Sequence, residues 1–439
     1  MSRANWGSKL GFVLATAGSA VGLGAIWKFP YMAGKNGGGA FLLVYLACVF
    51  TVGIGMLLAE MLIGRAAQKS ATTAFRNLKG GLWPWAGRLS VLCSFVILSF
   101  YSVVGGWTFA YLYQSITGAA ITSNIGELNT LFEQFIANPM LAVMYTAMFL
   151  GVTMWVVLRG VEKGIERWSK VLMPLLFTLM LLLIGRSLTL PGAMDGVSYF
   201  FTPNFSQINA SMVLDAMGLA MFSLSVGCGL LIAYGSYVAP DTNLGKTSLW
   251  ITLLATLACI FAGLLVLPAV FAFHVDPAAG PGLTFITMPA IFAQMPFGQL
   301  FAIAFFLLLI FAALTSSVSI LEPIVAFLMD EFGLARKQAT WTAGLSVFTF
   351  SIPAALSFGV LKDFLIAGKN PFDLMDYAAS NLMLPAGGLL SALFIGWAIW
   401  PRITQDLRQE GSERILPVFR IVCAWVSPAV IGAIWWHSL

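Results

Sequence analysis

Three glycines and a serine lie in the middle of a long apolar segment near the start of the chain. The segment runs from Leu10 to about Met32, and its centre reads Gly18-Ser19-Ala20-Val21-Gly22-Leu23-Gly24. Each interior glycine costs about 1 kcal/mol of helix stability relative to alanine, so the cluster predicts a helix that is interrupted in mid-membrane. Backbone groups released there must line a cavity or bind a ligand, because lipid offers them no hydrogen-bond partner. The alternative interpretation is a small-residue face for close helix packing.

A second apolar segment, 212–237, has the same feature at its midpoint. The sequence there is Phe222-Ser223-Leu224-Ser225-Val226-Gly227-Cys228-Gly229. Paired interrupted helices are typical of transporters that bind substrate and ions near the bilayer midplane. The chemistry on offer is that of carbonyl and hydroxyl oxygens, which suit a hard cation, and of half-helix N-termini, which suit a carboxylate.

The composition indicates an integral membrane protein. Of the 439 residues, 59% are hydrophobic and only 9% are charged, and the mean hydropathy is +0.90, which no soluble domain of this size matches. The formal charge of +5 comes from dispersed basic residues and does not indicate nucleic-acid binding. The chain is not expected to be an enzyme, because its two histidines and five apolar-segment cysteines form no metal or hydrolase pattern. The deep carboxylates Glu60 and Glu322 lie in different spans without a catalytic partner.

Hydropathy predicts eleven membrane spans at about 10–32, 39–64, 89–117, 140–158, 167–185, 212–237, 247–273, 299–328, 338–356, 376–400 and 415–436. Lysine and arginine gather in the loops after spans 2, 4, 8 and 10, whereas the loop after span 3 carries Glu127 and Glu133 and no basic residue. The positive-inside rule therefore predicts a cytoplasmic N-terminus and an extracytoplasmic C-terminus. No hydrophilic stretch is long enough for a soluble domain, so residues 1–439 are expected to form a single membrane domain.

Several short motifs add a family resemblance, and they are Trp6–Phe12, Ala17–Gly24, Trp27–Tyr31, Asn36–Phe41, Phe100–Tyr101, Gly106–Trp107, Phe222–Gly229 and Leu314–Ser317. In this order they resemble the neurotransmitter:sodium symporter (solute carrier 6-like) family, from Trp6 to about Trp400. The resemblance implies an all-α protein with a LeuT-type 5+5 inverted repeat, in which spans 1–5 and 6–10 are the repeats, spans 1 and 6 are interrupted and span 11 is additional. It also implies sodium-driven symport of amino acids or related amines by alternating access, here in a bacterial inner (plasma) membrane.

A sodium site is implied on span 1 and span 8. Its positions match the family's second sodium site, with the backbone carbonyls of Gly18, Val21 and Ala312 and the hydroxyls of Thr315 and Ser316 as ligands. An interrupted helix offers carbonyls that an intact helix would keep. The alternative is that Thr315 and Ser316 only bond back to their own helix, as is usual in membranes.

A substrate site is implied between the two interruptions, at positions Ala20, Gly22, Leu23, Gly24, Ile97, Tyr101, Phe222, Ser223, Ser225, Gly227, Cys228, Ser316, Ser319 and Ile320. In the family, the positions of the Leu23 and Gly24 amides and of the Tyr101 hydroxyl receive the substrate carboxylate. The carbonyls at Ala20, Phe222 and Ser225 match those that hold the ammonium group.

Two positions of this site bear on the choice of substrate. Gly22 stands where the monoamine-transporting branch has an aspartate in place of the missing carboxylate, which predicts a substrate with its own carboxylate. Cys228 stands where some relatives have phenylalanine, so the pocket is expected to admit a large apolar or aromatic group.

Two departures from the family pattern concern the other ions. Ala25 and Ala255 occupy positions where the family's first sodium site uses side-chain amides, so this site is expected to be weak or empty. The chloride site of animal relatives lacks its polar groups at Leu219, Ala255 and Cys259, beside Tyr45 and Ser223. We therefore expect coupling to one sodium ion and no chloride dependence. Alternatively, the substrate is another amine, a zwitterion or a cation whose basic group, or ordered water, fills the vacated space.

The resemblance also implies two gates. The outer gate is the ion pair of Lys28 and Asp376. The cytoplasmic gate is the ion pair of Arg3 and Asp330, with Trp6 and Tyr237 as aromatic partners. Interrupted helices can also line the pore of an ion channel. Charged gates on both sides of the site favour alternating access over a channel or an intramembrane enzyme.

Overall fold

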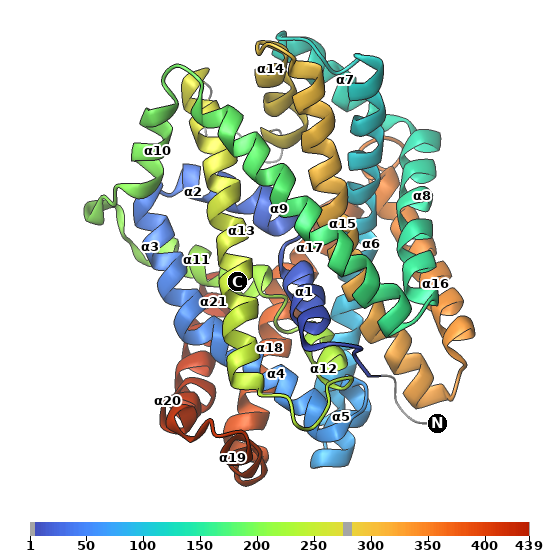
Figure 1. Cartoon of the computed structure of the whole chain (residues 1–439). Coiled ribbons are helices and arrows are strands. Elements are labelled where there is room, and N and C mark those ends of the chain that lie inside the picture. The colour runs from blue at the N-terminus through green and yellow to red at the C-terminus, as the bar shows by residue number, and fades with distance from the viewer. Residues whose placement is uncertain (1–4, 275–282, 439) are drawn as a thin grey trace.

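The computed structural model describes residues 5–274 and 283–438, and this part of the chain is helical, without strands. The long helices stand side by side in one bundle (Figure 1). Short helices α5 (Ala71–Leu78) and α19 (Trp400–Gln409) lie at one end, which we call the α5 end. Helices α7 (Ile125–Ala137), α10 (Ala193–Phe201) and α14 (Met288–Ala293) lie at the opposite end, which we call the α7 end.

Within the described residues, nine helices are long and apolar enough to cross a membrane. They are Gly39–Ala67 (α3, η2 and α4), Pro84–Thr117 (α6), Pro139–Leu158 (α8), Val161–Leu188 (η3 and α9), Leu244–Ala272 (α13), Gly298–Phe332 (α15), Arg336–Leu356 (α16), Pro371–Ala398 (α17, η6, α18 and η7) and Glu413–Ala433 (η8, α20, η9 and part of α21). Each begins and ends within a few residues of a predicted span. A tenth is the bent pair Lys9–Ala20 and Gly24–Lys35.

The predicted span 212–237 consists of two short helices, α11 (Ala210–Ser223) and α12 (Leu230–Gly235). Helix α11 has 14 residues and is too short to cross a membrane alone. The count of eleven spans therefore remains a prediction, whereas the all-helical membrane fold is confirmed.

The first interruption lies where the glycine cluster predicted it. Helix α1 (Lys9–Ala20) ends before Val21, whose φ and ψ of −89° and 59° are not helical. The helix resumes as η1 (Gly24–Lys28) and α2 (Phe29–Lys35), bent by 51° from α1. The amides of Ala25 and Ile26 both bond to the carbonyl of Gly22, at 3.1 and 3.2 Å. Because an α-helical Ala25 would bond to Val21 instead, the Val21 carbonyl has lost its regular partner.

The second interruption has a backbone cause. Three of the five residues from Ser225 to Gly229 have positive φ: Ser225 (+55°), Gly227 (+97°) and Gly229 (+73°). A right-handed helix cannot include such residues, and glycine adopts these angles at no steric cost. Gly229 also lies directly before α12 as its N-cap.

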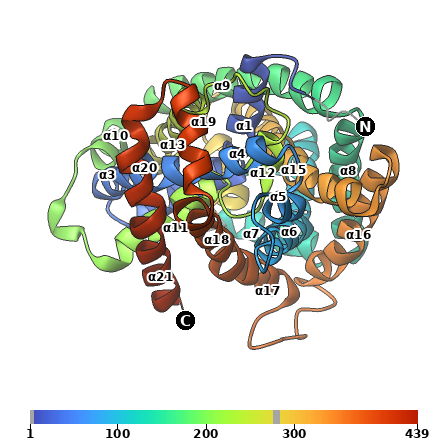
Figure 2. The ribbon, with the colours of Figure 1, turned by 90° about the horizontal axis from the view of Figure 1, so that it is seen from below.

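The interrupted helices pack on intact helices, α1 on α15, α13 and α9, and α12 on α4 and α15 (Figures 1 and 2). Helix α15 packs on α1, α6, α8, α9 and α16. Each break therefore faces intact helices that can position side chains against it.

Candidate functional site

The two interruptions meet at the carbonyl of Ser19. This oxygen accepts hydrogen bonds from the hydroxyl of Ser225, at 3.1 Å, and from that of Ser316, at 3.0 Å. Ser316 lies on α15, so one released carbonyl of α1 joins the second break to an intact helix. The small-residue packing interpretation does not account for this arrangement, because the released backbone group binds polar side chains.

A small cavity of about 40 Å³ lies between the two breaks. It is lined by Ser19, Ala20, Gly22, Gly24, Ile97, Tyr101, Phe222, Ser223, Ser225, Cys228, Ser316, Ile320 and Leu384. All of these except Ser19 and Leu384 belong to the substrate site expected from the sequence. The volume suits a few water molecules, so a larger occupant requires the walls to move apart.

Three residues expected in this cavity do not line it. The Ser319 hydroxyl accepts from Tyr234, at 2.7 Å, and donates to the Thr315 carbonyl, so it is turned away. The Gly227 amide donates to Oε1 of Glu60, at 2.9 Å, behind the cavity wall. Leu23 lines a second cavity instead. Ser319, Gly227 and Leu23 therefore lie beside the cavity and do not line it.

One face of the cavity offers hydrogen-bond donors at the start of a half-helix. The Leu23 amide, directly before η1, donates to the Tyr101 hydroxyl at 3.2 Å. The Tyr101 hydroxyl lies next to the Ser316 hydroxyl at Gly22, and a phenol can donate its own proton to an acceptor. A half-helix N-terminus and a phenol proton together suit an anion such as a carboxylate.

Gly22 and Gly24 line this cavity, and neighbouring side chains pack closely against both. A Cβ atom at Gly22 would overlap the Ser316 hydroxyl and would lie 3.0 Å from the Tyr101 hydroxyl. A Cβ atom at Gly24 would overlap the ring of Phe222. Side chains are therefore excluded at both glycines, and among the described residues no carboxylate lines this cavity.

Four of the five expected sodium ligands are linked by hydrogen bonds or close contacts, and they are Gly18, Ala312, Thr315 and Ser316. The Ser316 hydroxyl donates to the Gly18 carbonyl at 3.3 Å, so span 1 and span 8 meet at these atoms. The Thr315 hydroxyl donates to the carbonyls of Phe311 and Ala312, both at 3.0 Å. Thr315 therefore bonds only to its own helix, as in the alternative interpretation, whereas Ser316 bonds to the interrupted part of span 1. With the released Val21 carbonyl, these oxygens form a donor set suited to a hard cation.

The positions of the family's first sodium and chloride sites hold few polar groups. Ala25 and Ala255 are fully or almost fully buried, on η1 and α13, which are packed together. Beside them, the Tyr45 hydroxyl is hydrogen-bonded to Ser223, at 2.9 Å, and to Cys259, at 3.2 Å. The polar groups that remain at the chloride position thus satisfy one another.

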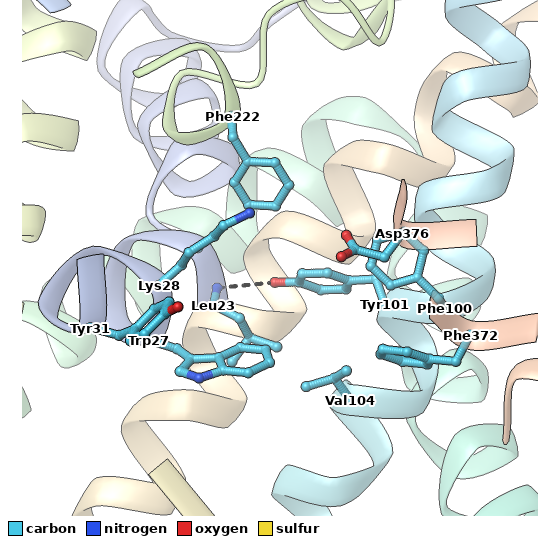
Figure 3. A pocket seen from close by; sticks show the side chains of 11 residues that line it. Leu23, Trp27, Lys28, Tyr31, Phe100, Tyr101, Val104, Phe222, Phe372 and Asp376 are labelled. Carbon is cyan, nitrogen blue, oxygen red and sulfur yellow. Dashed lines mark hydrogen bonds between the residues drawn. The ribbon is translucent and has the colours of Figure 1, made fainter. Parts of the chain in front are cut away.

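A second cavity of about 170 Å³ lies toward the α7 end and shares Gly24, Tyr101 and Phe222 with the first. Figure 3 shows its walls, which also include Leu23, Trp27, Lys28, Tyr31, Phe100, Val104, Phe372 and Asp376. The rings of Tyr101 and Phe222 thus stand between an outer and an inner cavity.

Lys28 and Asp376 lie on opposite walls of this outer cavity (Figure 3). The Lys28 ammonium lies 5.1 Å from the centre of the Phe222 ring, which is a cation–π contact. The Asp376 carboxylate accepts from Ser380 at 2.9 Å. The two residues expected to form the outer gate thus line the same cavity, but Lys28 contacts Phe222 and Asp376 contacts Ser380.

At the α5 end, Trp6 closes the bundle below the inner cavity. Its indole nitrogen donates to the Tyr234 carbonyl at 3.1 Å, and its amide donates to the Tyr237 carbonyl at 3.2 Å. The Tyr237 hydroxyl donates to Glu322 at 2.6 Å, and Glu322 is paired with Arg336. The sequence analysis placed Glu322 deep in a span without naming a partner, and this buried network was not predicted.

Asp330 also takes part in the contacts at the α5 end. Its carboxylate accepts from the Ser70 amide, at 2.6 Å, and lies 3.5 Å from the Lys69 ammonium. Its expected partner, Arg3, lies outside the described residues. Asp330 therefore joins the end of α15 to the start of α5.

A further contact at this end involves Glu166, which the sequence did not single out. Its carboxylate accepts from the Gly7 amide, at 2.7 Å, and from the Ser8 hydroxyl, at 2.8 Å, and is paired with Lys170. Ser8 is the N-cap of α1. In the sequence, Glu166 could have been noticed only as an acidic residue among the basic residues of the loop after span 4.

Comparison with known proteins agrees with this geometry. The sequence model of the "Sodium:neurotransmitter symporter family" matches residues 3–126 and 127–439. A Bacillus subtilis (strain 168) protein, "Uncharacterized sodium-dependent transporter YhdH", is 43% identical over 89% of this chain and 87% of its own length. A Haemophilus influenzae protein, "Uncharacterized sodium-dependent transporter", is 34% identical over 100% of this chain and 98% of its own. The "Crystal structure of MhsT in complex with L-phenylalanine" superposes with a TM-score of 0.92 at 43% identity, covering all of both chains.

Proposed function

This chain belongs to the sodium:neurotransmitter symporter family, and on that premise we propose that it takes up an amino acid with an apolar or aromatic side chain. Its family consists of membrane transporters, not enzymes, and its relatives are sodium-dependent. L-Phenylalanine is bound in MhsT, which makes this amino acid the first substrate to test.

The observation that carries the proposal is a pair of hydrogen-bond donors at the inner cavity, the Leu23 amide and the Tyr101 hydroxyl. Among the described residues, no acidic side chain lines this cavity. An anionic group must therefore come from the ligand if these donors are to be used. The carbonyls near Ala20 and Ser225 offer acceptors for an ammonium group on the opposite side of the same cavity.

The uptake experiment uses the protein in liposomes with an imposed sodium gradient. We expect radioactive L-phenylalanine to accumulate above its external concentration, and unlabelled L-phenylalanine to compete more strongly than phenethylamine, which lacks the carboxylate. A channel would let the gradient dissipate without accumulation. Accumulation of phenethylamine in preference to L-phenylalanine would overturn the proposal.

We propose that one sodium ion accompanies each substrate, at the site of Gly18, Val21, Ala312, Thr315 and Ser316. The released oxygens of α1 and the hydroxyls of α15 support this site, whereas Ala25 and Ala255 leave the first site without amide oxygens. The expected result is a Hill coefficient of about one for sodium-dependent uptake. A coefficient clearly above one would exclude coupling to a single ion.

Uptake is also expected to be independent of chloride. Tyr45 is hydrogen-bonded to both Ser223 and Cys259 at the positions where the animal relatives bind the anion. Replacing external chloride by gluconate at constant sodium should leave the uptake rate unchanged. A loss of more than half the rate on this exchange would show that an anion site exists.

We propose further that residues 1–439 form one membrane domain with spans 1–5 and 6–10 as inverted repeats and span 11 additional. The basic loops at the α5 end support a cytoplasmic position for that end and for the N-terminus. An extracytoplasmic C-terminus follows from eleven spans, in a bacterial inner membrane.

On this orientation the contacts of Asp330 hold the cytoplasmic side closed. Asp330→Ala removes the acceptor of the Ser70 amide and the partner of Lys69. Since such partly exposed contacts are worth about 1 kcal/mol or less, we expect a bias of a few fold toward inward-open states. Hydrogen exchange in residues 5–20 should be faster in the variant, and unchanged exchange there would count against the gate.

A further inference from the structure

A third cavity of about 130 Å³ lies between α8, η3–α9 and α15, apart from the substrate path. Its walls are Val152, Trp155, Val156, Ile165, Trp168, Ser169, Leu172, Phe311, Leu314, Thr315 and Val318. Helix α15 packs against both α8 and α9, so it forms the inner wall (Figure 2). Almost all the lining groups are apolar, which suits a hydrocarbon ligand.

This cavity is on the side of the bundle that faces lipid. Around it the membrane-spanning parts of α8 and α9 expose large apolar side chains, among them Met148, Trp155, Val171 and Leu175, each with 43–50% of its surface accessible. In a chain that spans a membrane, such surfaces are covered by lipid chains. The medium next to the cavity mouth is therefore the bilayer.

Two indole rings border the cavity mouth, and one carries an arginine. The rings of Trp155 on α8 and Trp168 on α9 are 5.5 Å apart. The guanidinium of Arg159 lies 3.8 Å above the Trp155 ring. Arg159 directly follows the last residue of α8, so it stands where the span leaves the membrane.

Further positive charge lies beside this arginine. Lys163 and Arg167 precede or begin α9 and are exposed. Among the described residues, neither they nor Arg159 has an ion-pair partner. Basic groups at the end of membrane helices attract anionic lipid headgroups.

We propose that this cavity binds one anionic phospholipid, with an acyl chain between α8 and α9 and the phosphate at Arg159 and Arg167. The chain end would contact the outer wall of α15 at Leu314 and Thr315. The basic side chains of Arg159 and Arg167 select an anionic headgroup, and the apolar cavity binds the acyl chain. This binding does not depend on the transported substrate.

The test uses the purified full chain in detergent with dioleoylphosphatidylglycerol or dioleoylphosphatidylcholine added, and counts retained lipids by native mass spectrometry. We expect one phosphatidylglycerol molecule to be retained at least tenfold more tightly than phosphatidylcholine. Val152→Trp, which fills the cavity from α8, should weaken retention of that molecule at least tenfold. Val152→Phe serves the same purpose if the tryptophan variant does not fold.

The headgroup part of the proposal has its own matched control. Arg159→Gln should remove the preference for phosphatidylglycerol. Arg88→Gln should keep it, because Arg88 stacks on the exposed Trp85 at 4.5 Å in the same way but lies beside no wall of this cavity. Equal retention in wild type and both Val152 variants would overturn the proposal, and so would an equal loss of preference in the two arginine variants.

Discussion

Replacing Thr315 by valine and Ser316 by alanine together is expected to raise the sodium concentration for half-maximal uptake about a hundredfold. The double variant removes both hydroxyl oxygens of the proposed sodium site and leaves the carbonyls of Gly18, Val21 and Ala312. A polar group that binds a charge contributes about 1.5 kcal/mol or more. Two such losses amount to about 3 kcal/mol, which is about two powers of ten in affinity.

Both substitutions should be tolerated by the fold. Valine has the shape of threonine, and the Thr315 hydroxyl bonds only to carbonyls of its own helix. The Ser316 hydroxyl is a donor to Gly18 and Ser19, whose carbonyls can accept from water or from Ser225 instead. Thermal unfolding without sodium should therefore change little, while the stabilisation by added sodium should be lost.

Ser317→Ala is the matched control for the sodium site. Ser317 is the next residue on α15 and is equally buried, but its hydroxyl bonds to Thr153 on α8, at 2.8 Å, and to the Leu314 carbonyl. This variant loses a buried hydroxyl without touching the break. If it shifted the sodium dependence as much as the double variant does, the effect would be one of packing and the sodium assignment would be wrong.

The interruptions were predictable because their cause is local. Glycine and serine at Gly18–Gly24 and Phe222–Gly229 disfavour a helix wherever they stand, and the structure breaks within both stretches. The positive φ angles of Gly227 and Gly229 express that preference directly. The lengths of the membrane-spanning helices were also predictable, because hydropathy is a local property. Helix α11 is the exception, since it is too short to qualify as a membrane span alone.

The partners of buried charged groups were not predictable, since they depend on how distant helices pack. Glu322 on α15 is paired with Arg336, the first residue of α16, and accepts from Tyr237 just after α12, and nothing in the local sequence specifies that meeting. Glu60 likewise accepts from the Gly227 amide and from Ser391, which lies 331 residues away. The hydropathy of the sequence predicts the depth of each residue in the membrane, but the packing of distant helices determines its hydrogen-bond or ion-pair partner.

The outer gate shows the same limit at the site itself. The motif places Lys28 and Asp376 on one cavity, but the flexible lysine side chain lies over Phe222. A lysine carries a point charge without the bidentate geometry of arginine, so its partner is set by the surrounding packing. A sequence match identifies such a gate position without fixing its state.

Tyr101→Phe is expected to weaken L-phenylalanine binding about thirtyfold. The phenol is the side-chain donor that faces the space at Gly22, and a hydrogen bond to a charged group contributes about 2 kcal/mol. The loss should be confined to ligands with a carboxylate. Competition binding with L-phenylalanine and L-phenylalaninol measures this, because the alcohol keeps the ring and the ammonium group.

The two ligands and two proteins form a thermodynamic cycle that isolates the contact between hydroxyl and carboxylate. In the wild type the carboxylate should favour L-phenylalanine strongly over L-phenylalaninol, and in Tyr101→Phe this ratio should shrink about thirtyfold. Tyr111→Phe is the control: it lies on the same helix, is fully buried, and its hydroxyl has no hydrogen-bond partner among the described residues. It should leave the ratio unchanged. If Tyr101→Phe weakened both ligands equally, the hydroxyl would position Leu23 and the half-helix, and the carboxylate would have to bind elsewhere.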